Sequence, residues 1–238
     1  MSELQNRLHR LTLKLDYMGM RCEQAVIDAV TALRKGDTES ADSVNKEDAF
    51  IDREEVAIEQ ECIRLLALYQ PAAVDLRTIC TYIKVNSDLE RIADLAASIA
   101  RQTKHSVSAG LVFEQYTDFD LLVTETLEIV GKTMRMITAS EISTAISVID
   151  DDDKIDRGYA GMVHNLLHSG KPVGPTMTLI NLAKALERIG DLCTNIAEDI
   201  IFLRTGDIIR HQSRAQIQVD LAPAVKEDKQ TKTAIKLD

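Results

Sequence analysis

Hydrophobic side chains recur every three or four residues along most of the chain, which is the spacing of the buried face of an α-helix. This pattern predicts six long helices, and glycine or proline residues mark the breaks between them. The expected helices cover residues 3–35, 38–69, 72–104, 113–138, 141–168 and 175–204. Because short connections make consecutive long helices antiparallel, we expect up-down-up bundles.

The two halves of the chain repeat each other. Residues 89–100 and 186–197 are identical at eight of twelve positions. Residues 47–53 and 151–157 are identical at four of seven positions, and the matches include two aspartates four residues apart. A period of roughly 100 residues is too long for a solenoid repeat and indicates a duplicated bundle. The sequence therefore predicts an all-α fold made of two tandem, pseudo-symmetric, antiparallel three-helix bundles, over residues 1–106 and 111–205.

The last part of the chain lacks this pattern. The periodicity fades after Gly206, and the residues from Lys226 onward are mostly charged or polar. Such a composition offers little apolar surface for burial in a core. We therefore expect residues 206–238 to form a polar, mobile tail, and the two bundles to be stable without it.

Composition narrows the range of partners. The chain has 38 acidic and 28 basic residues and a formal net charge of −10, which argues against binding to nucleic acid or to anionic lipid. No apolar run is long enough for direct membrane insertion. The four cysteines show no Cys-x-x-Cys spacing and fall in amphipathic stretches, which indicates reduced thiols in the core of a cytoplasmic protein.

Acidic residues occupy matched positions in the first predicted hairpin, which turns near Pro71. Asp52 and Glu90 lie 19 residues before and after this proline, and Asp48 and Asp94 lie 23 residues before and after it. Residues at equal distances from the turn of an antiparallel hairpin lie at equal heights. The hairpin therefore predicts four carboxylates at two levels, one helical turn apart.

The second hairpin, which turns near residues 171–172, repeats this arrangement by pairing Asp156 with Glu187 and Asp152 with Asp191. Carboxylates this close repel one another unless something neutralises them. Two alternatives remain open. The arginines of the same motifs, Arg53, Arg91 and Arg188, could cover the acids. Alternatively, each group could bind a hard cation such as magnesium, manganese, calcium or oxidised iron, because only oxygen ligands are available.

These motifs carry a family resemblance over roughly residues 1–205. The segments Glu90-Arg-Ile-Ala-Asp94 and Glu187-Arg-Ile-Gly-Asp191 resemble the duplicated signature of the PhoU family, and the aspartate pairs on the preceding helices match its partner motifs. Residues 70–77 look like the start of that family's third helix. One departure is that Ala93 stands where the family usually has glycine, as Gly190 does in the second half.

The resemblance implies two symmetric three-helix bundles with metal ions at the carboxylate clusters, iron above all, with manganese, magnesium or zinc as alternatives. It also implies a signalling adaptor that links the ATPase of the phosphate ABC transporter to a phosphate sensor histidine kinase. Such an adaptor acts as a negative regulator when phosphate is plentiful, and a homodimer is compatible with this role. The expected metal ligands are Asp48, Asp52, Glu90, Asp94, Asp152, Asp156, Glu187 and Asp191.

Three other readings use the same residues. A carboxylate di-iron enzyme needs Glu-x-x-His, but no histidine of this chain has an acid three residues before it, so we expect no enzymatic activity. A metal-free helical adaptor would pair its acids with arginine. A PhoU-like domain could also serve another phosphate carrier, such as a sodium–phosphate cotransporter.

His164 and His168 are four residues apart, but no third metal ligand is evident beside them.

Overall fold

The computed structural model describes residues 2–210 and 212–235, and it contains helices but no strand in these ranges. The long helices are α1 (Glu3–Lys35), α2 (Thr38–Tyr69), α3 (Ala73–Ser108), α4 (Thr117–Ala139), α5 (Ile142–Leu167), α6 (Val173–Thr205) and α7 (Arg214–Ile235). A short 3-10 helix, Phe113–Gln115, precedes α4. The six helices predicted from the hydrophobic pattern are all present, with ends shifted by a few residues.

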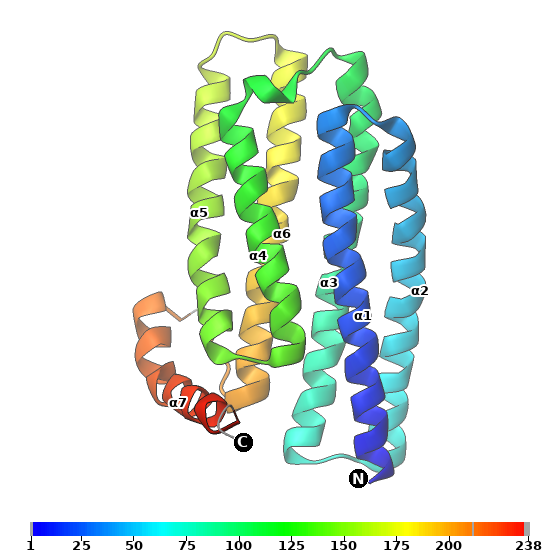
Figure 1. Cartoon of the computed structure of the whole chain (residues 1–238), viewed down its shortest axis with the longest axis vertical. Coiled ribbons are helices and arrows are strands. Elements are labelled where there is room, and N and C mark those ends of the chain that lie inside the picture. The colour runs from blue at the N-terminus through cyan, green and yellow to red at the C-terminus, as the bar shows by residue number, and fades with distance from the viewer. Residues whose placement is uncertain (1, 211, 236–238) are drawn as a thin grey trace.

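Helices α1 to α3 form one antiparallel bundle, and α4 to α6 form a second bundle beside it (Figure 1). The bundles join mainly where α3 packs on α6, and α1 also packs on α4. A single cluster of buried hydrophobic side chains contains residues from both halves. The predicted all-α fold of paired three-helix bundles is therefore confirmed, and the two bundles share one core.

Local sequence explains the turn between α1 and α2. Gly36 ends α1 in the left-handed conformation with φ of 64°, which costs glycine little. The side chain of Asp37 then accepts hydrogen bonds from the backbone N–H groups of Glu39 and Ser40, so α2 begins with two of its otherwise unpaired donors satisfied. This tight turn makes α1 and α2 antiparallel neighbours.

Helices α3 and α6 run antiparallel, and side chains tie them together near the end of α6. Arg77 Nε donates to the carbonyl oxygen of Leu203 at 3.0 Å. Lys84 Nζ donates to Asp199 Oδ1 at 2.8 Å, and Arg210, in the link to α7, donates to the same oxygen at 2.9 Å. Asp199 is only 2% exposed, so its charge is balanced by two cations inside the interface.

Within the segment expected to be a polar, mobile tail, residues 214–235 form α7. This helix packs on α5. Ile217 and Leu221, one turn apart, are 5% and 2% exposed, and Arg214 forms an ion pair with Asp153. Arg214 also lies 3.7 Å from Asp150, so these buried side chains and the ion pairs of one arginine hold a helix of polar composition against α5.

The cysteines follow the sequence expectation in the main. All four are free thiols, and Cys22, Cys62 and Cys193 are buried, whereas Cys80 on α3 is half-buried. Burial raises the pKa of both Cys62 and Cys193 to about 12. Within the described residues, no helix is long and apolar enough to span a membrane.

Candidate metal centres

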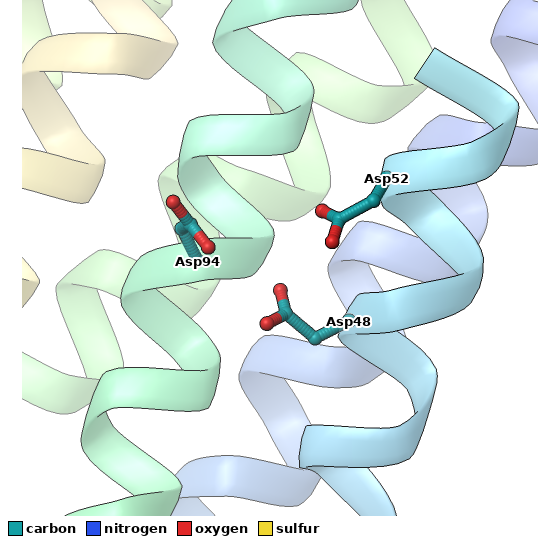
Figure 2. Close-up of side chains that lie close together, drawn as sticks. All are labelled: Asp48, Asp52 and Asp94. Carbon is teal, nitrogen blue, oxygen red and sulfur yellow. The ribbon is translucent and has the colours of Figure 1, made fainter. Parts of the chain in front are cut away.

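Three carboxylates meet between α2 and α3, and we call them the first triad: Asp48, Asp52 and Asp94. One oxygen from each lies within 4.8 Å of the others. Asp48 and Asp52 are one turn apart on α2, and Asp94 faces them from α3 (Figure 2). Oxygens at this separation are close enough to share a single cation after small side-chain adjustments.

The second half of the chain repeats this geometry in a second triad: Asp152, Asp156 and Asp191. Asp152 and Asp156 lie on α5 and Asp191 on α6, and one oxygen from each again lies within 4.8 Å of the others. Six of the eight acids predicted from the hairpins are thus brought together in two equivalent groups.

The two glutamates lie outside these triads. Glu90 is half-buried, and its pKa is raised by burial and by the negative charges of Asp94 and Asp52. Glu90 is therefore close enough to the first triad for the charges of the triad to act on it. Glu187 Oε1 accepts from Lys184 Nζ at 2.5 Å, while its Oε2 is buried without a hydrogen-bond partner in the described structure. Sequence spacing did not single out Lys184, although its position three residues before Glu187 suits a helical ion pair.

The pKa is raised at Asp48 in the first triad and at Asp152, Asp156 and Asp191 in the second, so these carboxylates hold their protons more tightly than ordinary aspartates do. Burial, followed by the charges of Asp156 and Asp191, raises the pKa of Asp152 to about 7. Burial, followed by the charges of Asp94 and Asp52, raises the pKa of Asp48. In the absence of a cation, ionised triads are therefore disfavoured, as expected for like charges held close together.

The arginines of the motifs make no direct ion pair with these acids in the described structure, although the charge of Arg188 acts on Asp191. Across the described residues, none of the eight acids forms an ion pair with an arginine. Arg91 approaches Asp88 at 3.6 Å instead, and Arg53 and Arg188 have no ion pair there. Asp48 Oδ1 and Asp152 Oδ1 are buried without a hydrogen-bond partner. Buried carboxylate oxygens without a hydrogen-bond partner fit a hard cation, and the arginines act on the acids only through their charge, without a direct ion pair.

A family model described as "PhoU domain" matches residues 15–103 and 120–200, which together make up more than half of the chain. The chain belongs to the PhoU family. Both triads lie within the two matched segments, one in each.

Relatives within the PhoU family match over most of their length. A phosphate-specific transport system accessory protein PhoU from Serratia marcescens is 32% identical over 202 residues, which are 82% of this chain and 81% of that protein. The corresponding protein of Escherichia coli is 31% identical and covers 82% of each chain.

Solved PhoU structures have the same fold. The crystal structure of PhoU from Pseudomonas aeruginosa superposes with a TM-score of 0.82 at 32% identity, over 86% of this chain and all of that one. A phosphate transport system regulatory protein PhoU from Streptococcus pneumoniae superposes with a TM-score of 0.78 at 26% identity, over 87% of this chain and 99% of that one.

The departure from the PhoU pattern at Ala93 coincides with a difference between the triads. A Cβ atom at Gly190 would lie 2.7 Å from Asp152 Oδ1, so the glycine allows this carboxylate to approach α6 closely. Ala93 occupies the equivalent position on α3, and Asp48 there is half-buried, whereas Asp152 is 8% exposed. The two halves therefore hold similar acids at different depths.

Proposed function

We propose that this chain is a metal-binding regulatory adaptor of phosphate uptake and not an enzyme. The observation that carries the proposal is the pair of equivalent carboxylate triads, one in each half of a PhoU-family chain. The proposed ligands are Asp48, Asp52 and Asp94 in one centre and Asp152, Asp156 and Asp191 in the other. Glu90 and Glu187 complete the two centres by changing rotamer.

The donor set supports the choice of metal. Carboxylate oxygens without cysteine or histidine suit iron, manganese or magnesium, and zinc is the less favoured alternative. A bound cation supplies the positive charge that each triad lacks, so it lowers the pKa values that burial and mutual repulsion raise. We propose iron as the resident metal.

Metal analysis of protein purified without chelator tests this proposal. Asp48→Asn with Asp94→Asn should remove the metal of the first centre and leave that of the second, and Asp152→Asn with Asp191→Asn should do the reverse. Asp42→Asn, an exposed acid on α2 outside the triads, is the matched control. Wild-type protein without metal, or double variants with full metal content, would contradict the ligand assignment and favour a metal-free adaptor.

The regulatory part of the proposal concerns partners. The relatives are named accessory proteins of the phosphate-specific transport system, and the long helices of this chain offer broad faces to other proteins. We propose that the chain acts in the cytoplasm, where it links the ATPase of the phosphate ABC transporter to a phosphate sensor histidine kinase and holds the kinase inactive when phosphate is plentiful. A homodimer is compatible with this role.

Co-purification from cells grown in high and low phosphate tests the partner assignment. Tagged wild-type chain should retain the transporter ATPase and the kinase in high phosphate, and deletion of the chain should leave phosphate-starvation genes active in both media. Retention of a different phosphate carrier in place of these partners would favour the alternative adaptor role.

A further inference from the structure

A cavity of about 580 Å³ lies between α3 and α6, where the two bundles meet. Its wall carries three arginines: Arg91 and Arg101 from α3, and Arg188 from α6. Arg91 and Arg188 are the same position of the duplicated motif, so each bundle contributes its equivalent guanidinium group to one shared space.

The antiparallel register explains this convergence. Lys84 on α3 donates a hydrogen bond to Asp199 on α6. Because the helices are antiparallel, the residue seven positions after Lys84, Arg91, lies near the residue seven positions before Asp199, Leu192. Both of these residues line the cavity. The duplicated motifs therefore cross near the middle of the two helices, and side chains that point out of one bundle face those of the other.

The cavity has a positive excess in a strongly acidic protein. Three guanidinium groups and two carboxylates, Asp94 and Asp191, line it, whereas the whole chain has a net charge of −10. Each of the two carboxylates also belongs to a triad. A cation bound to that triad would neutralise the negative charge that the carboxylate brings to the cavity. A volume of several hundred cubic ångströms suits a small molecule.

The guanidinium groups retain most of their hydrogen-bonding capacity. In the part of the chain that the structure describes, Arg188 has no hydrogen bond or ion pair. Arg91 approaches Asp88 at 3.6 Å, and Arg101 donates a single bond of 3.3 Å to Asn45. A guanidinium group has five N–H donors in a planar fork that matches the oxygens of a phosphate group.

We propose that this cavity binds a small phosphate-bearing anion through Arg91, Arg101 and Arg188. The anion lies beside Asp94 of the first triad and Asp191 of the second, so one ligand contacts both halves of the molecule. The choice of phosphate among tetrahedral oxyanions rests on the proposed function, whereas the oxyanion site itself rests on the cavity and its arginines.

Calorimetric titration of the purified full chain, loaded with manganese, tests the proposal with inorganic phosphate, pyrophosphate and ATP as separate ligands. Wild-type protein should bind at least one of them with a Kd of about 1 mM or tighter. Arg91→Gln with Arg188→Gln should weaken binding by at least about tenfold, because charge-assisted hydrogen bonds from both halves are lost. Comparison of the three ligands distinguishes free phosphate from the phosphate group of a larger molecule.

Arg53→Gln with Arg157→Gln is the matched control, because these arginines are also equivalent in the repeat and are exposed outside the cavity. This variant should bind like wild type. Arg91→Lys with Arg188→Lys keeps the charge without the planar fork and should bind with intermediate affinity. Thermal unfolding of each variant verifies that the fold is intact. We expect it to be intact because Arg91 and Arg188 are exposed.

Absence of saturable binding to wild type, or equal binding by the Arg91→Gln, Arg188→Gln variant, would overturn the site. Saturable binding of sulfate without phosphate would overturn the choice of anion. The titration uses the purified chain alone, so its outcome is independent of whether the transporter ATPase and the kinase co-purify in cells.

Discussion

At the scale of single residues, Asp152 is the most deeply buried of the eight predicted ligands, with 8% of its surface exposed. Its depth depends on Gly190, which leaves room for the carboxylate against α6. The first half has Ala93 at this position and a half-buried Asp48. The deeper carboxylate, Asp152, therefore lies opposite a glycine, and the shallower one, Asp48, belongs to the half that has the methyl group of Ala93.

We predict that Gly190→Ala weakens metal binding at the second centre by about tenfold and leaves the first unchanged. The added Cβ would lie 2.7 Å from Asp152 Oδ1 and 3.2 Å from Ile155 Cδ1, so the carboxylate must move outward. Competitive titration with a chromophoric chelator measures both sites. Gly161→Ala is the control, since a Cβ at Gly161 meets nothing within 4 Å, and it should stabilise α5 by about 0.5–1 kcal/mol. Unchanged affinity in Gly190→Ala would refute the role of the glycine.

The raised pKa of Asp152, about 7, predicts how the metal-free protein responds to pH. The pKa in the folded state is above the unfolded value, so folding favours the protonated carboxyl, and this stabilisation is lost as pH rises from about 4 to above 7. At pH 8 the loss amounts to about 4 kcal/mol at most.

Metal-free protein should therefore melt at a lower temperature at pH 8 than at pH 5.5, and manganese should restore the melting temperature at pH 8. Asp152→Asn should reduce the pH dependence and raise the melting temperature of the metal-free protein at pH 8. A wild-type melting temperature that does not fall between these two pH values would show that Asp152 ionises normally in the folded protein.

At the scale of elements, the link between α6 and α7 takes part in the junction of the bundles. Arg210 and Lys84 both bond Asp199, which is 2% exposed. Burial, partly offset by the charge of Arg91, raises the pKa of neighbouring Asp88 to about 6. The segment that follows α6 therefore supplies a cation to an interface that contains a buried acid, Asp199, and a half-buried one, Asp88.

We predict that Arg210→Ala lowers the free energy of unfolding by about 1–3 kcal/mol, because Asp199 then keeps only Lys84 as a partner in a buried site. Urea unfolding monitored by circular dichroism measures the effect. Adding Asp199→Asn to Arg210→Ala should recover part of the loss, since the uncompensated charge is gone. Arg10→Ala, an exposed arginine on α1, should change the stability by less than about 0.5 kcal/mol.

At the scale of the whole molecule, α3 and α6 each bury a second face in addition to the face that packs inside their own bundle. Consecutive residues, which point about 100° apart on a helix, are both buried at several turns. These pairs are Ile92 and Ala93, Ala96 and Ala97, and Ile99 and Ala100 on α3, and Ile189 and Gly190, Leu192 and Cys193, and Ile196 and Ala197 on α6. Each bundle therefore needs the other to cover its third helix.

We predict that residues 1–109 expressed alone do not remain monomeric, because the face of α3 that packs on α6 would be exposed to water. Light scattering coupled to size-exclusion chromatography should give a dimer or larger species. Addition of separately expressed residues 110–238 should produce a one-to-one complex. A stable monomer of residues 1–109 would mean that the halves are independent domains.

The sequence predicted what depends on distance along the chain and missed what depends on rotation about a helix or on packing between halves. Counting from Pro71 matched Asp48 with Asp94 and, one turn away, Asp52 with Glu90, and three of these four residues meet. Height does not fix the direction of a side chain, so Glu90 lies outside the group. The convergence of Arg91 with Arg188 depends on how α3 crosses α6, which no hairpin length specifies. Helix α7 was missed because its apolar contacts, Ile217 and Leu221, are few.

The uneven burial of the thiols gives the native chain a single attachment point for a probe. Three cysteines are enclosed in the core, and only Cys80 is within reach of a maleimide reagent. Cys80 lies one turn before Lys84, next to the seam between the bundles. A fluorophore placed there would report relative motion of the halves in unmodified protein, without any engineered cysteine.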